Sequence, residues 1–317
     1  MTGIARHQAT DSDELACALA GWSQDYTQLG HGRLQAELLH VQLPDASLIY
    51  EHSNLHLHEN MAPPAGHLVI GIPLRASDDS RFNGQALHDD TLLVLEGGRE
   101  LEICAAGEIH MLGLTFSQPQ LERLLGAEER ELFERALEQR RLQLSPSGAG
   151  NLRRSLCGAI ASFEEEPWRT ADPQQAGHAV ARVLSHVLQA LEEILPGSTR
   201  DGAPRSLQQH RRLVLAAIDR MQADLAQPLS LLELSQSLNT SQRTLQYCFR
   251  QICQSTPQQF FLSLRLAEAR RRLKQEPQQS ITHLALDLGF ASSSHFSTLY
   301  KRLYAEQPSL ISRSRSR

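Results

Sequence analysis

The 317-residue chain is long enough for two domains, because a single hydrophobic core stops growing before that length. Its composition, 41% hydrophobic and 21% charged, is that of a soluble globular protein, and no apolar run reaches the roughly 20 residues that span a bilayer. The polar N-terminus lacks the apolar stretch of a signal peptide, and the five scattered cysteines form no CxxC pair. We therefore expect a cytoplasmic protein with reduced cysteines and no contact with a membrane.

The net charge of −5 is distributed unevenly along the chain. From Leu207 onward, fifteen Arg and Lys stand against seven Asp and Glu, whereas the preceding part carries sixteen basic and twenty-nine acidic residues. A basic segment of this kind is the electrostatic candidate for binding a polyanion. The pattern predicts an acidic module joined to a basic one.

The N-terminal part has the pattern of short β-strands. We expect the polar residues 1–15 to be frayed. From Trp22 to Phe116, short apolar stretches alternate with turn signals such as Asn83-Gly84. These stretches are residues 38–41, 47–50, 67–72, 91–95 and 111–114. Strands at this spacing predict a β-sandwich or barrel for a domain of residues 1–117.

A helical region of residues 118–195 follows, with helices expected over 118–140, 148–163 and 174–195. The third helix repeats apolar residues at intervals of three or four, namely Val180, Leu184, Val187 and Leu191. We predict that this stripe pairs with its copy in a homodimer, the alternative being that it packs on its own chain. We also expect this region to carry any signal onward, because the next residues, 196–206, have the composition of a flexible linker.

Residues 207–317 contain an internal repeat of a short helix, a tight turn and a second helix. Leu231, Ser235, Leu238 and Asn239 recur fifty residues later as Ile281, Ala285, Leu288 and Gly289, and Ser241, Phe249 and Pro257 recur after fifty-one as Ser292, Tyr300 and Pro308. Asn239 and Gly289 tolerate the left-handed conformation that ends a helix, and Ser241 and Ser292 are suitable N-caps. The repeat predicts two helix-turn-helix units.

The second helix of each unit has one apolar and one polar face. The residues expected to be buried are Leu245, Phe249, Ile252, Phe296, Tyr300 and Leu303. The residues expected to contact DNA bases are Arg243, Gln246, Tyr247, Ser294 and Thr298. Those expected to contact phosphates are Ser241, Arg250, Ser292, Ser297, Lys301 and Arg302. Arg and Gln can read base edges bidentately, so the first unit should carry more sequence discrimination than the second. The alternative for any one of these residues is a solvated surface position.

Several C-terminal motifs share a pattern with known regulators. They are Leu229-Ser230-Leu231-Leu232-Glu233-Leu234, Ser241-Gln242-Arg243-Thr244-Leu245-Gln246, Ile281-x3-Ala285-x3-Gly289-Phe290, Ser294-His295-Phe296-Ser297 and Tyr300-Lys301. With these motifs, residues 211–311 resemble the DNA-binding domain of the AraC/XylS family of bacterial transcription regulators. The resemblance implies a transcription regulator, an activator or a repressor, whose two recognition helices enter successive major grooves of promoter DNA, with RNA polymerase as a further partner. Ala305 stands where the family usually has glycine, and Ile311-Ser312 replaces a Tyr-Arg pair.

Five short segments resemble the ethanolamine-operon regulator branch of that family. Three lie in the N-terminal part, at residues 21–29, 71–73 and 82–84, and two in the C-terminal part, at 243–246 and 307–310. This resemblance implies an α+β chain with an N-terminal cupin-like β-barrel, a helical dimerisation region and a C-terminal all-α tandem helix-turn-helix domain. Regulators of this branch serve many circuits, including quorum sensing and virulence, so the resemblance does not identify a ligand or effector-binding residues. The size and apolar lining expected of the barrel suit a small-molecule effector, the alternative being a barrel that only supports dimerisation.

A cupin-like barrel can also be a metal enzyme, and His52, His56 and His58 lie close together in the sequence. On a strand, His56 and His58 would face the same side, as two metal ligands do. Glu59 faces the other side, no later motif supplies the missing ligands, and no phosphate loop or nucleophile elbow is present. We therefore expect surface histidines, no metal, no cofactor and no catalytic residues. The alternatives are a cupin-type metal enzyme, which would carry a stoichiometric metal, and an interaction scaffold with a weak DNA domain.

Overall fold

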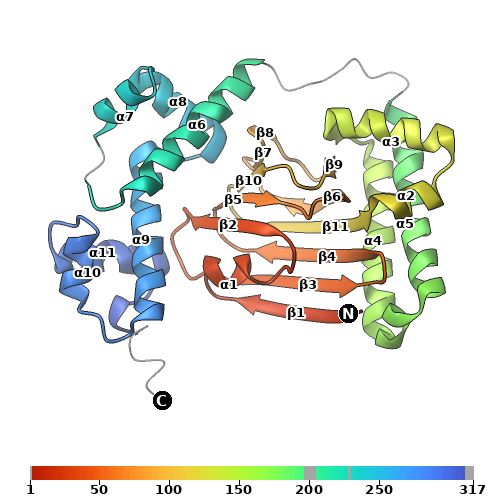
Figure 1. Cartoon of the computed structure of the whole chain (residues 1–317), viewed down its shortest axis with the longest axis horizontal. Helices are drawn as coiled ribbons and strands as arrows, with labels where there is room; N and C mark the ends of the chain where they lie inside the picture. The colour runs from red at the N-terminus through yellow and green to blue at the C-terminus, as the bar shows by residue number, and fades with distance from the viewer. Residues whose placement is uncertain (1, 196–204, 228–229, 311–317) are drawn as a thin grey trace.

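The computed structural model describes residues 2–195, 205–227 and 230–310, which form a sheet region, a layer of helices beside it and a separate group of C-terminal helices (Figure 1). A seven-stranded sheet has the order β1 (Gly3–Ala9), β3 (Ala36–Gln42), β4 (Ala46–Ser53), β11 (Ile109–Ser117), β6 (His67–Ala76), β9 (Thr91–Glu96) and β12 (Arg141–Gln143). A five-stranded sheet has the order β2 (Ser23–Gln28), β5 (Leu57–Ala62), β10 (Leu101–Ala105), β7 (Arg81–Phe82) and β8 (Gln85–Ala86).

The two sheets pack face to face as a sandwich, and neither closes on itself within the described residues. Met61 of β5 and Val69 of β6 belong to one apolar core between the sheets, together with Leu93 and Ile103. The strand spacing predicted a sandwich or a barrel, and the open sheets support the first alternative. The cupin-like closed barrel is not confirmed.

The inner strands of the seven-stranded sheet are buried on both faces. Leu38 faces the five-stranded sheet, whereas its neighbour Leu39 faces the helices. The same alternation places Val69 between the sheets and Ile70 under the helices. Burial on both faces explains why these strands read as continuous apolar runs in the sequence.

The expectation of a frayed N-terminus is wrong. Residues 3–9 form β1, which pairs antiparallel with β3 from Gly3 opposite Gln42 to Ala9 opposite Ala36. Helix α1 (Ser12–Ala16) follows and buries Leu15. An edge strand is held by backbone hydrogen bonds, which do not depend on its side chains. The polar side chains of this segment therefore gave no sign of a strand in the sequence.

The helical layer consists of α2 (Gln118–Leu124), α3 (Ala127–Gln139), α4 (Pro146–Glu165), the 3-10 helix Pro167–Ala171 and α5 (Pro173–Ile194). The predicted dimer stripe of α5 lies inside the chain: Val180, Leu184, Val187 and Leu191 are each at most 2% exposed. They pack in one core with α4 and the seven-stranded sheet. The structure thus shows the alternative in which the stripe packs on its own chain, and a dimer would have to use another surface.

The C-terminal helices are α6 (Arg205–Ala223), α7 (Leu231–Ser237), α8 (Gln242–Cys253), α9 (Pro257–Gln275), α10 (Ile281–Asp287) and α11 (Ser293–Tyr304). Residues 196–204 of the expected linker, as well as Leu229 and Ile311-Ser312, lie outside the described residues, and residues 205 and 206 already belong to α6. No described helix has the length and apolarity that crossing a membrane requires. All five cysteines are free thiols, and three of them are buried.

Replacing Leu184 with alanine should lower the free energy of unfolding by about 2–5 kcal/mol, because it leaves a cavity in the core beneath α5. Urea unfolding followed by circular dichroism measures this. The control Gln189→Ala, on the exposed face of the same helix, should change it by less than about 0.5 kcal/mol. Unchanged stability together with a smaller mass in sedimentation would instead show that the stripe is a dimer seam.

Candidate nucleic-acid interface

The two predicted helix-turn-helix units are present and have the same turn. The first pairs α7 with α8, and the second pairs α10 with α11. Asn239 and Gly289 adopt left-handed conformations, with φ of 50° and 70°. In each turn, the backbone N–H five positions after the small residue donates to its carbonyl: Thr240 to Ser235, and Phe290 to Ala285, both at 2.9 Å. The turns therefore use one hydrogen-bonding scheme, which is typical of helix C-termini.

Each second helix begins at the serine that was predicted to cap it. Ser241 Oγ accepts a hydrogen bond from the Thr244 N–H at 3.0 Å, and Ser292 Oγ accepts one from the His295 N–H at 3.1 Å. Between the units, Thr256 and Gln259 form a reciprocal capping box at the start of α9. The two serine caps confirm the local predictions on which the repeat rested.

The faces of α8 and α11 divide as expected. Leu245, Phe249, Ile252, Phe296, Tyr300 and Leu303 are all buried. All eleven predicted DNA contacts are exposed or half-buried: Ser241, Arg243, Gln246, Tyr247, Arg250, Ser292, Ser294, Ser297, Thr298, Lys301 and Arg302. Tyr247 is the most conspicuous of them, since its side chain is large, apolar in part and 55% exposed. The structure thus brings the predicted contacts onto two open helix faces, while their contact with DNA stays a prediction.

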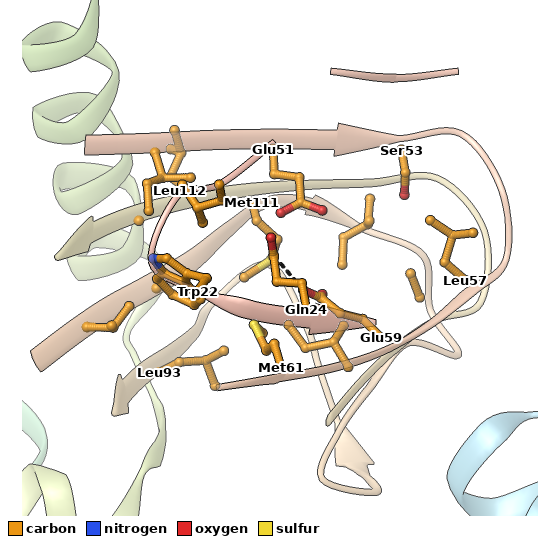
Figure 2. Close-up of a pocket in the computed structure, with 18 of the residues that line it drawn as sticks. Trp22, Gln24, Glu51, Ser53, Leu57, Glu59, Met61, Leu93, Met111 and Leu112 are labelled. Atoms are coloured by element: carbon orange, nitrogen blue, oxygen red, sulfur yellow. Dashed lines mark hydrogen bonds between the residues drawn. The ribbon is translucent and has the colours of Figure 1, made fainter. Parts of the chain in front are cut away.

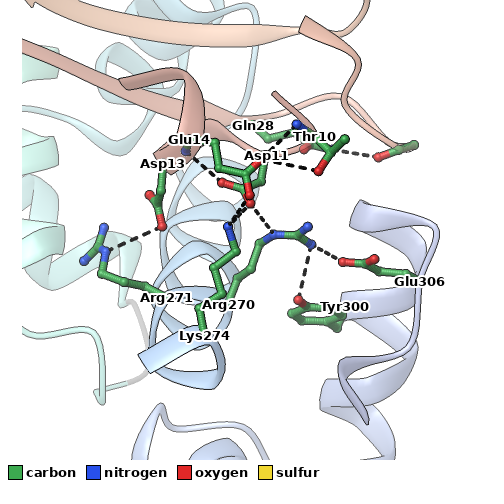
Figure 3. A network of polar contacts seen from close by, with 11 residues as sticks. Thr10, Asp11, Asp13, Glu14, Gln28, Arg270, Arg271, Lys274, Tyr300 and Glu306 are labelled. Carbon is green, nitrogen blue, oxygen red and sulfur yellow. Dashed lines mark hydrogen bonds and ion pairs between the residues drawn. The ribbon is translucent and has the colours of Figure 1, made fainter. Parts of the chain in front are cut away.

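Part of the basic charge of α9 is paired with acidic side chains near the N-terminus of the chain (Figure 3). Lys274 contacts Asp11 and lies 3.3 Å from Glu14 Oε1, and Arg271 Nε lies 3.9 Å from Asp13 Oδ2. Arg270 Nε lies 3.7 Å from Asp11 Oδ2, so two cations of α9 meet one carboxylate that is only 2% exposed. The charge imbalance that predicted a polyanion-binding module therefore also serves the contact between the two modules.

Both second helices are held to the sheet region at their last turns. The Leu303 carbonyl of α11 accepts hydrogen bonds from the Gly32 N–H at 2.8 Å and from Gln28 Nε2 at 3.0 Å. The Cys253 carbonyl of α8 lies 3.1 Å from His56 Nε2. The sequence carried no signal for these contacts, because each acceptor is a backbone group remote from its donor along the chain.

The Asn83-Gly84 turn also touches α8. Its residues join β7 to β8 with φ of 47° and 79°, as the sequence predicted for a tight hairpin turn. A Cβ atom on Gly84 would lie 2.4 Å from Ile252 Cδ1 and 3.0 Å from Leu207 Cδ1. Glycine at this position thus allows the hairpin to reach the base of the first helix-turn-helix unit.

A cavity between the two sheets contains a small group of polar side chains (Figure 2). Most of its lining is apolar, including Trp22, Leu57, Met61, Leu93 and Met111. Tyr26 Oη donates to Glu51 Oε1 at 2.9 Å, and Gln24 Nε2 donates to Glu59 Oε1 at 3.1 Å. Burial raises the pKa of Glu51 to about 7 and that of Glu59 to about 8, the negative charge of Glu51 adding to the second shift. The cavity is therefore an apolar site with two carboxyl groups that exchange protons near neutral pH.

The three histidines do not form one cluster. The ring of His52 on β4 stacks on that of His110 on β11, with the ring centroids 4.2 Å apart. Both half-buried rings lie beside Glu108. His58 is instead buried on β5, with Nε2 3.1 Å from Glu102 Oε1. The expectation of three surface histidines is therefore wrong for His58, because the C-terminal helices cover that face of the five-stranded sheet.

Comparison with known proteins supports the helix-turn-helix assignment. Residues 234–314 match the protein family described as "Helix-turn-helix domain". The HTH-type transcriptional regulator ArgR of Pseudomonas aeruginosa is 33% identical over 135 residues, covering 42% of this chain and 40% of that protein. The HTH-type transcriptional activator RhaS of Pectobacterium carotovorum is 28% identical over 166 residues, covering 52% of this chain and 55% of that protein. The chain thus spans from two fifths to just over half the length of these curated relatives.

Among solved structures, that of the AraC-like transcriptional activator CuxR is similar, with a TM-score of 0.42 and 13% identity, over 84% of this chain and 96% of that chain. The matched family and the observed helices agree on the C-terminal region, which contains a helix-turn-helix domain.

Ala305 ends α11 in a left-handed conformation, with φ of 55°. Because such a conformation costs a non-glycine residue about 1–2 kcal/mol, Ala305→Gly should raise the free energy of unfolding by about 0.5–1 kcal/mol after the larger entropy of glycine in the unfolded chain. Thermal and urea unfolding measure the gain. The matched change Ala181→Gly, inside α5, should lower stability by about 1 kcal/mol. Equal losses in both variants would contradict the strain at residue 305.

Proposed function

We propose that the chain is a sequence-specific DNA-binding transcription regulator of AraC/XylS type. In this proposal residues 1–117 sense an effector, 118–195 form a helical support, 196–206 connect and 207–317 bind promoter DNA. The observation that supports it best is the repeat of two helix-turn-helix units with the same turn, the same cap and two exposed polar faces. Two similar proteins are named as a transcriptional regulator and a transcriptional activator, which favours a regulator over an enzyme.

The spacing of the units supports binding to two successive major grooves. Helix α9 joins them and has 19 residues, which corresponds to a length of about 28 Å. One turn of B-DNA is about 34 Å long, so a rigid connection of this size suits two contacts on one face of the duplex. Arg243 and Gln246 would read bases, while Ser241, Ser292 and the N–H groups they leave exposed would hold phosphates.

A homodimer and a contact with RNA polymerase remain part of the proposal, on surfaces other than the α5 stripe. Two units in one chain already supply two groove contacts, so dimerisation would add affinity and is not required for reading a single site. Membership of the ethanolamine-operon branch is likewise part of the proposal. The cavity between the sheets allows a test of whether the chain binds a small effector there.

Replacing Arg243 or Gln246 with alanine should weaken binding to the specific site by about 1–3 kcal/mol and binding to random DNA far less. Selection of bound genomic fragments supplies the site, and gel-shift titration measures both affinities. Arg182→Ala, an exposed arginine of α5, is the matched control and should leave both unchanged. Equal losses on specific and random DNA would show that the two residues contact only phosphates.

For the effector, the cavity favours a small organic cation with an apolar body. Its walls are apolar, and Glu51 and Glu59 are the acidic groups among the residues that line it. A cation between two buried carboxylates relieves both the desolvation of each group and their mutual repulsion. A neutral ligand would leave Glu51 and Glu59 without a counter-charge, so that they would have to stay protonated in part. An anion would be repelled by their negative charges.

Binding of a small primary amine should strengthen as pH rises from 6 to 8.5, because the carboxyl groups with pKa values of about 7 and 8 must lose protons to receive the cation. Trp22 lines the cavity, so its fluorescence in a Trp168→Phe background reports binding. Glu59→Gln should weaken binding at least tenfold and flatten the pH profile, whereas Glu108→Gln, outside the cavity, should do neither. Binding of neutral alcohols with equal affinity at every pH would contradict the cation.

A further inference from the structure

We propose that the contact between the five-stranded sheet and the first helix-turn-helix unit is a binding site for a zinc-like transition-metal ion, with His58, Glu102 and Cys253 as ligands. The proposal rests on the geometry of this contact and does not depend on the chain binding DNA. It goes beyond the effector cavity, which lies between the two sheets and contains none of these three residues.

Three elements bring the ligand atoms together. His58 lies on β5 and Glu102 on the neighbouring strand β10, where Cys104 is directly opposite His58. Glu102 is two residues from Cys104, so the side chains of Glu102 and His58 share one face of the sheet. Cys253 is the last residue of α8. His58 Nε2, a carboxylate oxygen of Glu102 and Cys253 Sγ all lie within 4.8 Å of one another.

The three side chains are deeply buried and poorly satisfied. Glu102 is 1% exposed, and His58 and Cys253 are buried with it. Among the described residues, neither oxygen of Glu102 nor His58 Nε2 has a well-directed hydrogen bond. His58 Nε2 lies 3.1 Å from Glu102 Oε1, and Arg211 Nε lies 3.4 Å from Glu102 Oε2. A buried carboxylate without hydrogen bonds is costly, and a divalent ion would satisfy all three groups at once.

The combination of donors specifies the class of metal. Imidazole and thiolate are ligands of zinc and the later first-row metals, whereas magnesium and calcium prefer sites made of oxygen atoms alone. Zinc binds nitrogen, oxygen and sulfur at about 2.0–2.3 Å, so small side-chain rotations would draw the three atoms onto one ion. A water molecule would complete four ligands. Binding would release the thiol proton of Cys253 to solvent.

The position of the site links metal binding to the docking of the sheet region against α8. Two ligands belong to the sheet region and the third to α8, so the site is complete only when the two regions are docked. An ion that binds only this arrangement stabilises it in proportion to its concentration relative to its Kd.

The test uses the full chain, treated with a chelator and a reductant, then titrated with Co²⁺ as a spectroscopic substitute for zinc. We expect one ion per chain, a thiolate-to-cobalt charge-transfer band in the near ultraviolet and loss of that band when Zn²⁺ displaces Co²⁺. Cys253→Ala should abolish the band, and His58→Gln should weaken binding at least tenfold. The control Cys17→Ala, which changes an exposed thiol elsewhere, should leave the band unchanged.

A second control separates this site from the half-exposed group His52, Glu108 and His110, which contains no thiol. His110→Gln should therefore not affect the charge-transfer band. The proposal is overturned if the wild-type chain shows no such band, or if the band persists in folded Cys253→Ala. It is also overturned if binding depends on His110 alone. Should Cys253→Ala fail to fold by circular dichroism, the affinity of His58→Gln decides the question.

Discussion

The last turns of two helices are hydrogen-bonded to one side of the sheet region, and these contacts determine how the C-terminal helices lie against it. A helix leaves its last carbonyl groups without partners, and here Leu303 of α11 and Cys253 of α8 direct theirs toward donors of the sheet region. Because the second helices of both units are held at the same end, their capped first turns, at Ser241 and Ser292, stay exposed. One set of contacts thus positions both units relative to the sheet region.

The residues whose side chains hold these helix ends belong to, or directly adjoin, strands that also line the cavity. On β2, Tyr26 lies in the cavity wall, and Gln28, two residues on, reaches α11. On β5, Glu59 lines the cavity, while its neighbour His58 faces the C-terminal helices, since successive side chains point to opposite faces. A ligand that shifts either strand would therefore act directly on the docking contacts. The sequence led us to expect a route through the helices of residues 118–195, and β2 and β5 offer a shorter one.

What could be predicted from the sequence is what depends on near neighbours along the chain. The caps at Ser241 and Ser292 and the left-handed residues Asn239 and Gly289 each involve groups within five positions, so residue type and spacing were sufficient. The same holds for the strands between Ala36 and Ser117 that have apolar runs.

The rest depends on partners far away in sequence. The stripe of α5 was correctly identified as apolar, but periodicity identifies a face and not what covers it. Edge strand β1 has polar side chains and is held by its backbone. Glu51 of β4 and Glu59 of β5 meet in the cavity only because the two sheets pack face to face. Asp11 forms an ion pair with Lys274, which lies 263 positions away along the chain, and no local sequence pattern indicates such a contact.

The ion pairs of α9 make ionic strength act on this molecule in two opposing ways. In the proposed DNA complex, added salt weakens the contacts between basic side chains and phosphates, because the release of counterions becomes less favourable. It also weakens the pairs of Arg271 with Asp13 and of Lys274 with Asp11 and Glu14, which bind basic side chains to the sheet region. Undocked, the same cations would exchange carboxylates for phosphates and steepen the salt dependence of DNA binding. A plot of the logarithm of affinity against the logarithm of salt concentration would then curve instead of following a single line.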